Sequence, residues 1–361
     1  MPRTTTPTIK SVALLAGVHI STVSRALDPS RQHLIGAQAL ARVQTAARDL
    51  GYASNRAASA LRTGRSMVVG ILLPDISNPV FPPIFQGIEA TLSKSGYLPL
   101  VMNSASASQR RAQASRMHAQ GVDGVIMASA SDRDEALTYL RQVGMPMVLV
   151  NRSYADGKNC AVISDDAQAM KLAVAHLYAL GHRRIAHLAG PAQFSTGVAR
   201  LEGFRAALQQ HGIEEAGVVI AEAYSRRAGK LGCDQLLHLR SRFSAKTATK
   251  NHSQHSVTKA QAQGFTAVVA ANDLLALGAY DALHEAMLRV GQDISVVGHN
   301  DMPLMDMVSP PLTTVRIQHA EMGSQAARLL LALIDKESTG ITQIVLQPEL
   351  VIRLSTAAPL T

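Results

Sequence analysis

The feature that most constrains the fold is an alternation of short apolar runs with longer amphipathic stretches, which begins at Met67. The runs of strand length are residues 68–74, 98–102, 122–127, 147–151, 184–189, 217–221, 266–270 and 294–297. The stretches with helical spacing are residues 82–96, 109–120, 134–143, 166–180, 198–211, 226–239 and 273–290. Such alternation predicts parallel sheets with crossover helices, and its length predicts two α/β lobes with a cleft between them.

The charge of the chain is concentrated at its N-terminus. Residues 1–66 hold nine of the 35 basic residues and two of the 26 acidic ones, so they carry +7 of the formal net charge of +9. A small basic head on a nearly neutral body is typical of a nucleic-acid-binding protein. A solvated basic tail is the alternative, but the head is too regularly apolar for that.

The head itself has the pattern of a helix-turn-helix module. Residues 8–16 predict a short helix with Thr8 as its N-cap, and Gly17 is suited to end that helix in the left-handed conformation. A second helix is expected over about residues 20–27, followed by a third over about 37–50. Helix, tight turn, helix and supporting helix is the helix-turn-helix arrangement.

The second predicted helix carries side chains suited to reading DNA. Ile20 and Ser21 open it, and Arg25 lies one turn beyond Ser21 on the same face. Arginine makes bidentate bonds to guanine, serine bonds to several bases, and Ile20 makes only apolar contact, for example with a thymine methyl group. Thr22 and Ser24 are better placed for phosphate. The alternative for Arg25 is a contact to phosphate alone.

Two strings make the head resemble the lactose-repressor and galactose-repressor (LacI/GalR) family of bacterial transcriptional regulators. The first, T-I-K…V-A…A-G-V…S-T-V-S-R, runs from Thr8 to Arg25, and the second, L-G-Y…N-R…L-R-T-G-R, from Leu50 to Arg65. The resemblance implies an all-α helix-turn-helix domain, a hinge helix with its linker, and an α/β two-lobed domain like a periplasmic binding protein that binds effector and dimerises. The implied bounds are 1–54, 55–66 and 67–361, with lobe 1 at about 67–163 and 317–347 and lobe 2 at about 164–316 and 348–361.

The resemblance also assigns a role to the hinge. Asn55, Arg56 and Arg62 fit the family's hinge helix, which orders when two subunits meet on the operator. Leu61 occupies the position of a leucine that wedges between base pairs in the minor groove, where an apolar side chain unstacks a step and bends the duplex. The alternative for Leu61 is an ordinary linker leucine.

The body resembles the same family along nearly its full length. The matching strings are residues 74–79, 180–186, 200–204, 271–273, 293–298 and 310–316. The resemblance implies three crossings between the lobes, near residues 162–164, 316–319 and 345–350. It also implies an effector site in the cleft, made of Asn78, Phe81, Asn151, Thr196, Arg200, Tyr224, Asn272 and Asn300. The alternatives are an inter-lobe ion pair for Arg200 and a surface aromatic for Tyr224.

One departure from the family bears on the effector. Asn300 stands where the family usually has an acid that accepts hydrogen bonds from sugar hydroxyls. An amide carries no charge, so we expect Arg200 to face the cleft less compensated and to prefer a carboxylate, as in a sugar acid. The competing hypothesis is that Asp273 or Asp301 supplies the charge and the effector is neutral.

Other departures concern stability and a loop. The family usually has Asp at position 11 and Ser at position 19, so Ser11 and His19 predict the loss of two helix caps, each worth ~1 kcal/mol. Residues 240–263 form a polar insertion that we interpret as a long loop; residues 240–259 hold five bases and no acid. His252 and His255 suggest a metal site, but a solvated loop is the stronger interpretation.

These features predict a sequence-specific, ligand-responsive regulator, most simply a repressor, that binds a palindromic operator as a homodimer. The chain has no heptad tail after its last strand, which favours a dimer over a tetramer. Two cysteines far apart, no apolar run of membrane-spanning length and no secretory signal predict a cytoplasmic protein at the nucleoid, without membrane association.

Two other classes of function fit the sequence less well. A solute-binding protein of a transporter shares the body fold, but the basic head and the missing signal argue against it. An enzyme is disfavoured because no nucleophile, phosphate loop or metal motif is present, so we expect no catalytic residue, cofactor or metal.

Overall fold

The computed structural model describes residues 7–28, 31–52, 64–104, 106–128, 134–154, 157–250, 264–337 and 340–360, with the backbone alone over 241–250. The chain divides into two compact units, Met1–Met67 and Val68–Thr361. No helix of the described part is long and apolar enough to span a membrane.

The first unit is helical in its described residues. Its elements are α1 (Ile9–Ala16), α2 (Ile20–Ala26), the short 3-10 helix η1 (Gln32–Leu34) and α3 (Ala37–Asp49). Gly17, at a φ of 62°, supplies the left-handed residue between α1 and α2 that glycine adopts without steric cost. The helices enclose one apolar core, made of Val12, Ala13, Ala16, Val23, Ala26, Val43, Ala46 and Ala47. The predicted helix-turn-helix module is therefore present.

The expected loss of two helix caps is wrong. Thr8 accepts a hydrogen bond from the backbone N–H of Ser11, and the Ser11 hydroxyl accepts one from the N–H of Thr8 at 2.9 Å, so the reciprocal capping box is complete. At the start of α2, Nδ1 of His19 accepts from the N–H of Ser21 at 3.2 Å. A serine hydroxyl and an imidazole nitrogen supply the acceptors that the usual residues would have supplied.

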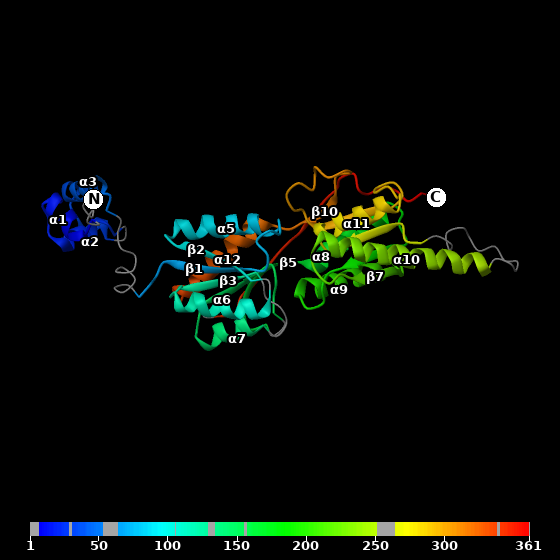
Figure 1. Cartoon of the computed structure of the whole chain (residues 1–361), viewed down its shortest axis with the longest axis horizontal. Helices are drawn as coiled ribbons and strands as arrows, with labels where there is room; N and C mark the ends of the chain where they lie inside the picture. Colours follow the sequence, from blue (N-terminus) through cyan, green and yellow to red (C-terminus); the bar gives the residue numbers. More distant parts are fainter. Residues whose placement is uncertain are drawn as a thin grey trace, which may run out of the picture. The chain divides into compact units, whose positions relative to one another are not determined.

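The first lobe of the second unit is a parallel sheet with strand order β11-β5-β4-β3-β1-β2 (Figure 1). Its strands are β1 (Val68–Leu73), β2 (Leu98–Asn103), β3 (Gly124–Met127), β4 (Met147–Val150), β5 (Cys160–Ser164) and β11 (Gln343–Leu346). Its helices are α5 (Phe81–Lys94), α6 (Ala107–Ala119), α7 (Glu135–Gln142) and α12 (His319–Ile334). Helices α5 and α12 pack together on one face, and α6 and α7 cover the other.

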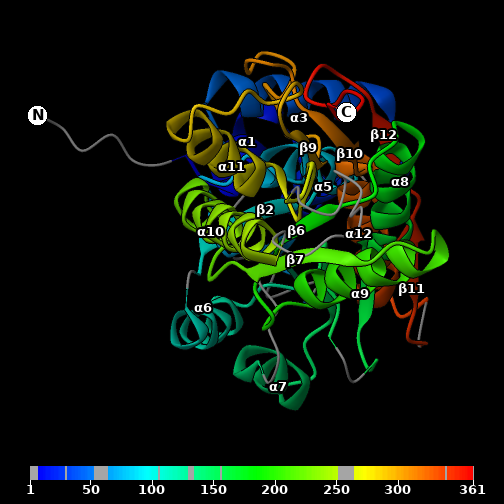
Figure 2. The same cartoon turned by 90° about the vertical axis from the view of Figure 1, so that its right-hand side faces the viewer.

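The second lobe repeats this plan with strand order β12-β10-β9-β8-β6-β7, in which only the pairing of β12 with β10 is antiparallel among the described strands. Its strands are β6 (Ile185–Ala189), β7 (Glu215–Ile220), β8 (Ala267–Ala270), β9 (Ser295–Asn300), β10 (Thr313–Arg316) and β12 (Glu349–Val351). Its helices are α8 (Asp166–Ala179), α9 (Ser195–Gln210), α10 (Arg226–Lys250) and α11 (Asp273–Glu285). Helices α8 and α9 lie on one face and α10 and α11 on the other (Figure 2).

The chain passes between the lobes where β5 leads into α8, where β10 leads into α12, and where β11 leads into β12. These crossings lie at or beside the segments that the resemblance implies. Each lobe has its own apolar core, one around Met117, Val125 and Leu140 and the other around Val174, Phe204 and Val269.

Two predicted boundaries in the second lobe are wrong. Helix α10 continues to Lys250, whereas we predicted an end at residue 239 and a polar loop over 240–263. Neither glycine nor proline occurs between Gly232 and Gly264, so nothing in the sequence stops the helix at residue 239. Helix α11 ends at Glu285 rather than at residue 290.

Candidate functional site

The DNA-reading face predicted for the head lies on α2 and is open to solvent. Ile20, Ser21, Ser24 and Arg25 are exposed and Thr22 is half-buried, while Val23 and Ala26 on the opposite side of the helix are buried. Ser21 is also held in place, because its hydroxyl lies 2.8 Å from Nδ1 of His19. The predicted hinge residues Asn55, Arg56, Leu61 and Arg62 lie outside the described residues.

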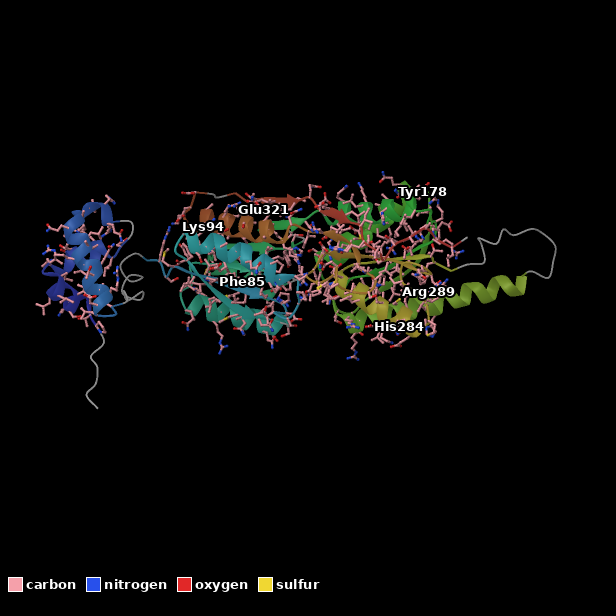
Figure 3. All side chains as sticks on the ribbon, turned by 90° about the horizontal axis from the view of Figure 1, so that it is seen from above. Phe85, Lys94, Tyr178, His284, Arg289 and Glu321 are labelled. Atoms are coloured by element: carbon pink, nitrogen blue, oxygen red, sulfur yellow. The ribbon has the colours of Figure 1, made fainter. Side chains whose placement is uncertain are left out.

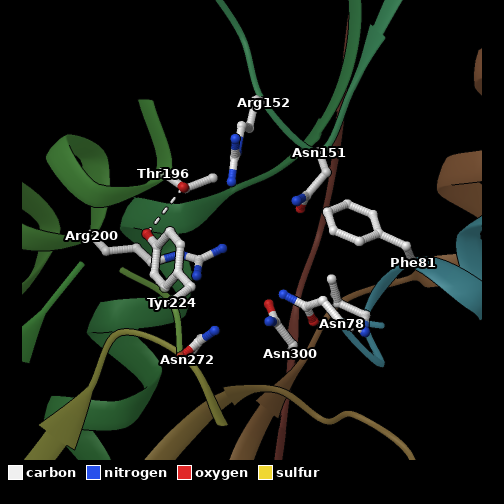
Figure 4. A pocket seen from close by; sticks show the side chains of 10 residues that line it. Asn78, Phe81, Asn151, Arg152, Thr196, Arg200, Tyr224, Asn272 and Asn300 are labelled. Atoms are coloured by element: carbon white, nitrogen blue, oxygen red, sulfur yellow. Dashed lines mark hydrogen bonds between the residues drawn. The ribbon is translucent and has the colours of Figure 1, made fainter. Parts of the chain in front are cut away.

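A polar pocket lies between the two lobes of the second unit (Figure 4). The side chains that line it are Asn78, Val80, Phe81, Asn151, Arg152, Thr196, Arg200, Tyr224, Asn272 and Asn300. All eight predicted effector-site residues are thus brought together. Val80 and Arg152 were not predicted.

The pocket residues converge because parallel strands carry their carboxyl ends to one edge of a sheet. Asn78 follows β1, Asn151 follows β4, and Asn272 follows β8, where it caps α11 by accepting from the N–H of Leu275 at 2.9 Å. Asn151 and Asn300 have φ values of 65° and 113°, left-handed conformations that asparagine tolerates better than most residues. Figure 4 shows the amides of both residues pointing into the pocket.

Arg200 on α9 is buried and paired within its own lobe. Its Nε donates to Oδ1 of Asp166 at 2.8 Å, and its Nη1 donates to the carbonyl of Ala271 at 2.6 Å. Burial raises the pKa of the Asp166 carboxyl, and the guanidinium of Arg200 acts against that rise. The expectation that Arg200 faces the cleft less compensated is therefore wrong, and so is the alternative of an inter-lobe pair, because Asp166 opens α8 of the same lobe.

Arg152 is the cation of the pocket that lacks an anionic partner. It is 6% exposed, and its Nε and Nη1 have no hydrogen-bond partner among the described residues. Its guanidinium lies 3.7 Å from the centre of the Phe194 ring, a contact that joins the two lobes. Burial lowers the pKa of Arg152 to about 10, so it stays charged at neutral pH. The signal for it was its place next to the predicted Asn151.

His299 connects the pocket wall to the ion pair behind it. Its Nδ1 lies 2.9 Å from Oδ1 of Asn300, and its Nε2 lies 3.4 Å from Oδ1 of Asp166. Burial holds the pKa of His299 well below its usual range, so the ring is neutral at neutral pH. A neutral ring carries one proton; Nδ1 donates it to the amide oxygen of Asn300, and Nε2 has no hydrogen-bond partner among the described residues.

The two acids expected to balance Arg200 have other partners. Asp273 accepts from the hydroxyl of Thr314 and from the N–H of Met302, and burial raises its pKa to about 7. Asp301 accepts from Nε of Arg316 at 2.7 Å and lies 2.8 Å from Nη1 of Arg353. Neither one lines the pocket.

Tyr224 closes one side of the pocket. Its hydroxyl lies 3.1 Å from the hydroxyl of Thr196 (Figure 4). Its ring stacks on Phe194 with the ring centres 6.2 Å apart. The alternative of a surface aromatic is wrong, because the ring faces the cleft. No group of three or more His, Cys, Asp or Glu side chains suited to a metal occurs within the described ranges, and His252 and His255 lie outside them.

A helix-turn-helix head followed by a two-lobed α/β domain is the architecture of a DNA-binding transcriptional regulator. The model for bacterial regulatory proteins of the lacI family matches residues 8–55, and that for the periplasmic binding protein-like domain matches residues 174–356. The chain belongs to the LacI family of transcriptional regulators.

Individual relatives match over nearly the whole length. The HTH-type transcriptional regulator MalR of Streptomyces coelicolor is 32% identical over 98% of this chain and 97% of its own. The complex of the regulator CelR with cellobiose superposes with a TM-score of 0.71 at 29% identity, covering 97% of this chain and 99% of that one. The lac repressor dimer bound to operator and the anti-inducer ONPF gives a TM-score of 0.81 at 27% identity, covering 98% and 99%. These relatives are regulators, neither enzymes nor solute-binding proteins, so neither alternative class is supported.

Proposed function

We propose that this protein is a transcriptional repressor that binds a palindromic operator as a homodimer and responds to a small acidic effector held in the cleft. The observation that carries this proposal is that one chain holds both an exposed α2 face and a polar pocket. All eight predicted effector-site residues line that pocket. The protein acts in the cytoplasm, on the DNA of the nucleoid. An effector that touches both lobes changes operator affinity by the difference in its affinity for two lobe arrangements.

The operator is read by α2 and by the hinge. Arg25 and Ser21 contact base edges in the major groove, Ile20 makes an apolar contact, and Thr22 and Ser24 bind phosphate. In the hinge, Leu61 enters the minor groove, with Asn55, Arg56 and Arg62 beside it. Base contacts then set the sequence preference, and phosphate contacts set the register.

Dimerisation uses an apolar groove on the first lobe, occupied by a second copy of the chain. The groove is lined by Leu73, Ile76, Phe81, Pro82, Phe85 and Val101, and Figure 3 marks Phe85 on α5. Ile76 is 60% exposed, and the groove adjoins β2, the edge strand of its sheet. Exposed apolar surface of this kind marks protein interfaces, and the similar lac repressor structure is that of a dimer.

The acidic effector follows from the charge of the pocket. The charge of Arg200 is balanced by Asp166, so the uncompensated positive charge belongs to Arg152. Within the part of the chain that the structure describes, the lining residues include two arginines and no carboxylate. A sugar acid supplies both an anionic group and hydroxyls that bond to the asparagine amides.

The test begins by selecting duplexes that the full chain binds from a random pool and measuring their binding by gel shift. Residues 68–361 alone should bind no duplex specifically and should still bind effector. Leu61→Ala should weaken operator binding and spare salt-dependent binding to random duplex. Equal losses on both duplexes would contradict the wedge.

The effector and the dimer have tests of their own. Asn300→Asp places a carboxylate in the pocket, so it should weaken the binding of an acidic effector and spare that of a neutral one in calorimetry. Unchanged or improved affinity for an acidic effector would contradict the proposal.

Ile76→Asp should convert a dimer to a monomer in sedimentation velocity. A wild-type chain that sediments as a monomer at micromolar concentration would exclude the proposed dimer.

A further inference from the structure

We propose that Arg152 is the residue that reads the charge of the effector, and that it binds a single carboxylate group. The inference rests on the proposed function, because it concerns the ligand of the same pocket. It goes further by placing the acidic group at one end of the cleft and by fixing its chemical class. The ligand is a small polyhydroxylated monocarboxylate.

Arg152 differs from the other buried arginines in having no anionic partner. Among the described residues of the second unit, three arginines are buried. Arg110 is 5% exposed, and its Nε lies 2.7 Å from Oδ2 of Asp134. Arg200 is 3% exposed and pairs with Asp166. Arg152, at 6% exposed, leaves Nε and Nη1 without a partner.

A buried cation without a partner requires an anion. Removing a guanidinium from water without an anionic partner is strongly unfavourable. Phe194 offsets part of that cost through its ring face, but it supplies no hydrogen-bond acceptor. Figure 4 shows the guanidinium of Arg152 pointing into the pocket from the side of the first lobe. A ligand anion there would supply both the charge and the acceptors.

The surroundings of the Arg152 guanidinium favour a planar anion. Phe194 lies against one face of the guanidinium, so hydrogen-bond acceptors approach in its plane. A planar carboxylate matches the planar fork of arginine in two parallel bonds. One uncompensated guanidinium balances one negative charge, whereas a phosphate monoester carries about 1.5 to 2 negative charges at neutral pH.

The remaining lining groups indicate the chemistry of the rest of the ligand. The other lining groups are mainly neutral and polar, with amides at Asn78, Asn151, Asn272 and Asn300. Amides donate to and accept from hydroxyl groups. A carboxylate on Arg152 in the first lobe and hydroxyls near Asn272 in the second would join the lobes through one small molecule. Such a ligand stabilises the closed arrangement of the lobes.

The main experiment measures binding by calorimetry on the full chain. The probes are glucuronate, galacturonate and gluconate, each against its neutral parent sugar, together with glucose 6-phosphate. We expect at least one acid to bind about 10- to 100-fold more tightly than its parent, and Arg152→Met to remove that preference. Arg152→Lys should retain part of it, because lysine keeps the charge without the fork. A preference for a neutral sugar or for the phosphate ester, or an acid preference that survives Arg152→Met, would overturn the proposal.

A second measurement needs no ligand. Arg152→Met removes an unpaired buried charge, so the Tm of the unliganded chain should rise by about 2–5 °C. The matched control is Arg110→Met, which leaves Asp134 buried and unpaired and should lower the Tm. If both variants lower the Tm alike, Arg152 is structural and the proposal is wrong, even if no probe binds.

Operator binding of the wild-type chain is measured in parallel. A chain that binds no selected duplex would reject the proposed repressor function. The carboxylate preference and the sign of the Tm shift would still decide the role of Arg152. The two failures are therefore distinguishable.

Discussion

The carboxylate of Asp166 accepts a hydrogen bond from Nε of Arg200 at 2.8 Å, and both side chains belong to the second lobe. Because Asp166 balances the charge of Arg200, Arg200 lines the pocket without giving it a net positive charge. The same carboxylate oxygen lies 3.4 Å from Nε2 of His299, whose other ring nitrogen faces Asn300. Arg200 and Asn300 are thus coupled through residues that do not line the pocket.

Asp166→Asn should reveal this coupling. The substitution keeps the shape of the side chain but leaves Arg200 buried without an anion, which should cost about 3–5 kcal/mol in the free energy of unfolding measured with urea. The pocket then carries two uncompensated guanidinium groups, so affinity for an acidic ligand should rise. Glu202→Gln, at an exposed acid on α9, is the matched control and should change neither quantity. A loss below 1 kcal/mol would mean that the pair adds little.

Gly190→Ala should disturb the pocket through Tyr224. A Cβ at Gly190 would overlap the hydroxyl and ring of Tyr224, so the ring must move from its place beside Thr196. Ligand affinity measured by calorimetry should fall about tenfold, a loss of about 1.4 kcal/mol. Gly340→Ala is the control, because no atom lies within 4 Å of the added Cβ. Unchanged affinity for Gly190→Ala would show that Tyr224 does not contact the ligand.

Much of the fold could be predicted from the sequence, because the strands and helices of the second unit are short, strongly patterned and separated by turn residues. Most boundaries agree within about three residues. The end of α10 could not be predicted, since a polar segment without glycine or proline suits a helix as well as a loop. The caps at Ser11 and His19 were also missed, because the sequence alone does not show which acceptor a backbone N–H will use.

The pocket residues could be predicted because the resemblance supplied the place in the fold of the strands, and of the helices after them, that carry these residues. The balance of charges in the pocket could not be predicted from the sequence. Asp166 lies 34 positions from Arg200 in the sequence, and only the packing of α8 against α9 brings the two together. Arg152 is next to the predicted Asn151, but its burial and lack of a partner are properties of the folded cleft.

Stability should depend on pH through His187. This ring is buried, stacks on Phe204 with the ring centres 4.6 Å apart, and burial lowers its pKa to about 4. Its ordinary pKa is 6.5, so its contribution to stability is present above pH 6.5 and is lost as the pH falls toward 4. Between these values the wild type should lose about 2–4 kcal/mol more than His187→Phe in urea unfolding.

Asp273 acts in the opposite direction. Its pKa is raised to about 7, so its contribution is present below its ordinary value of 3.8 and is lost as the pH rises toward 7. Because wild type and His187→Phe share this group, the difference between them at each pH isolates the histidine. Parallel stability curves for the two proteins would show that His187 does not titrate in this range.

Arg25→Ala should relax the base preference at one position of the operator. Arg25 is exposed one turn after Ser21, so its guanidinium can bond a guanine edge. Losing that bond should cost about 1–3 kcal/mol of binding free energy on the operator. The loss should be smaller on operators substituted at that base pair. Arg31→Ala, at an exposed arginine outside α2, should weaken binding to every duplex alike. Affinities across a series of single-base substitutions measure both effects. If Arg25→Ala lowers affinity equally across that series, Arg25 contacts phosphate alone, and the specificity of α2 must come from Ser21 and Ile20.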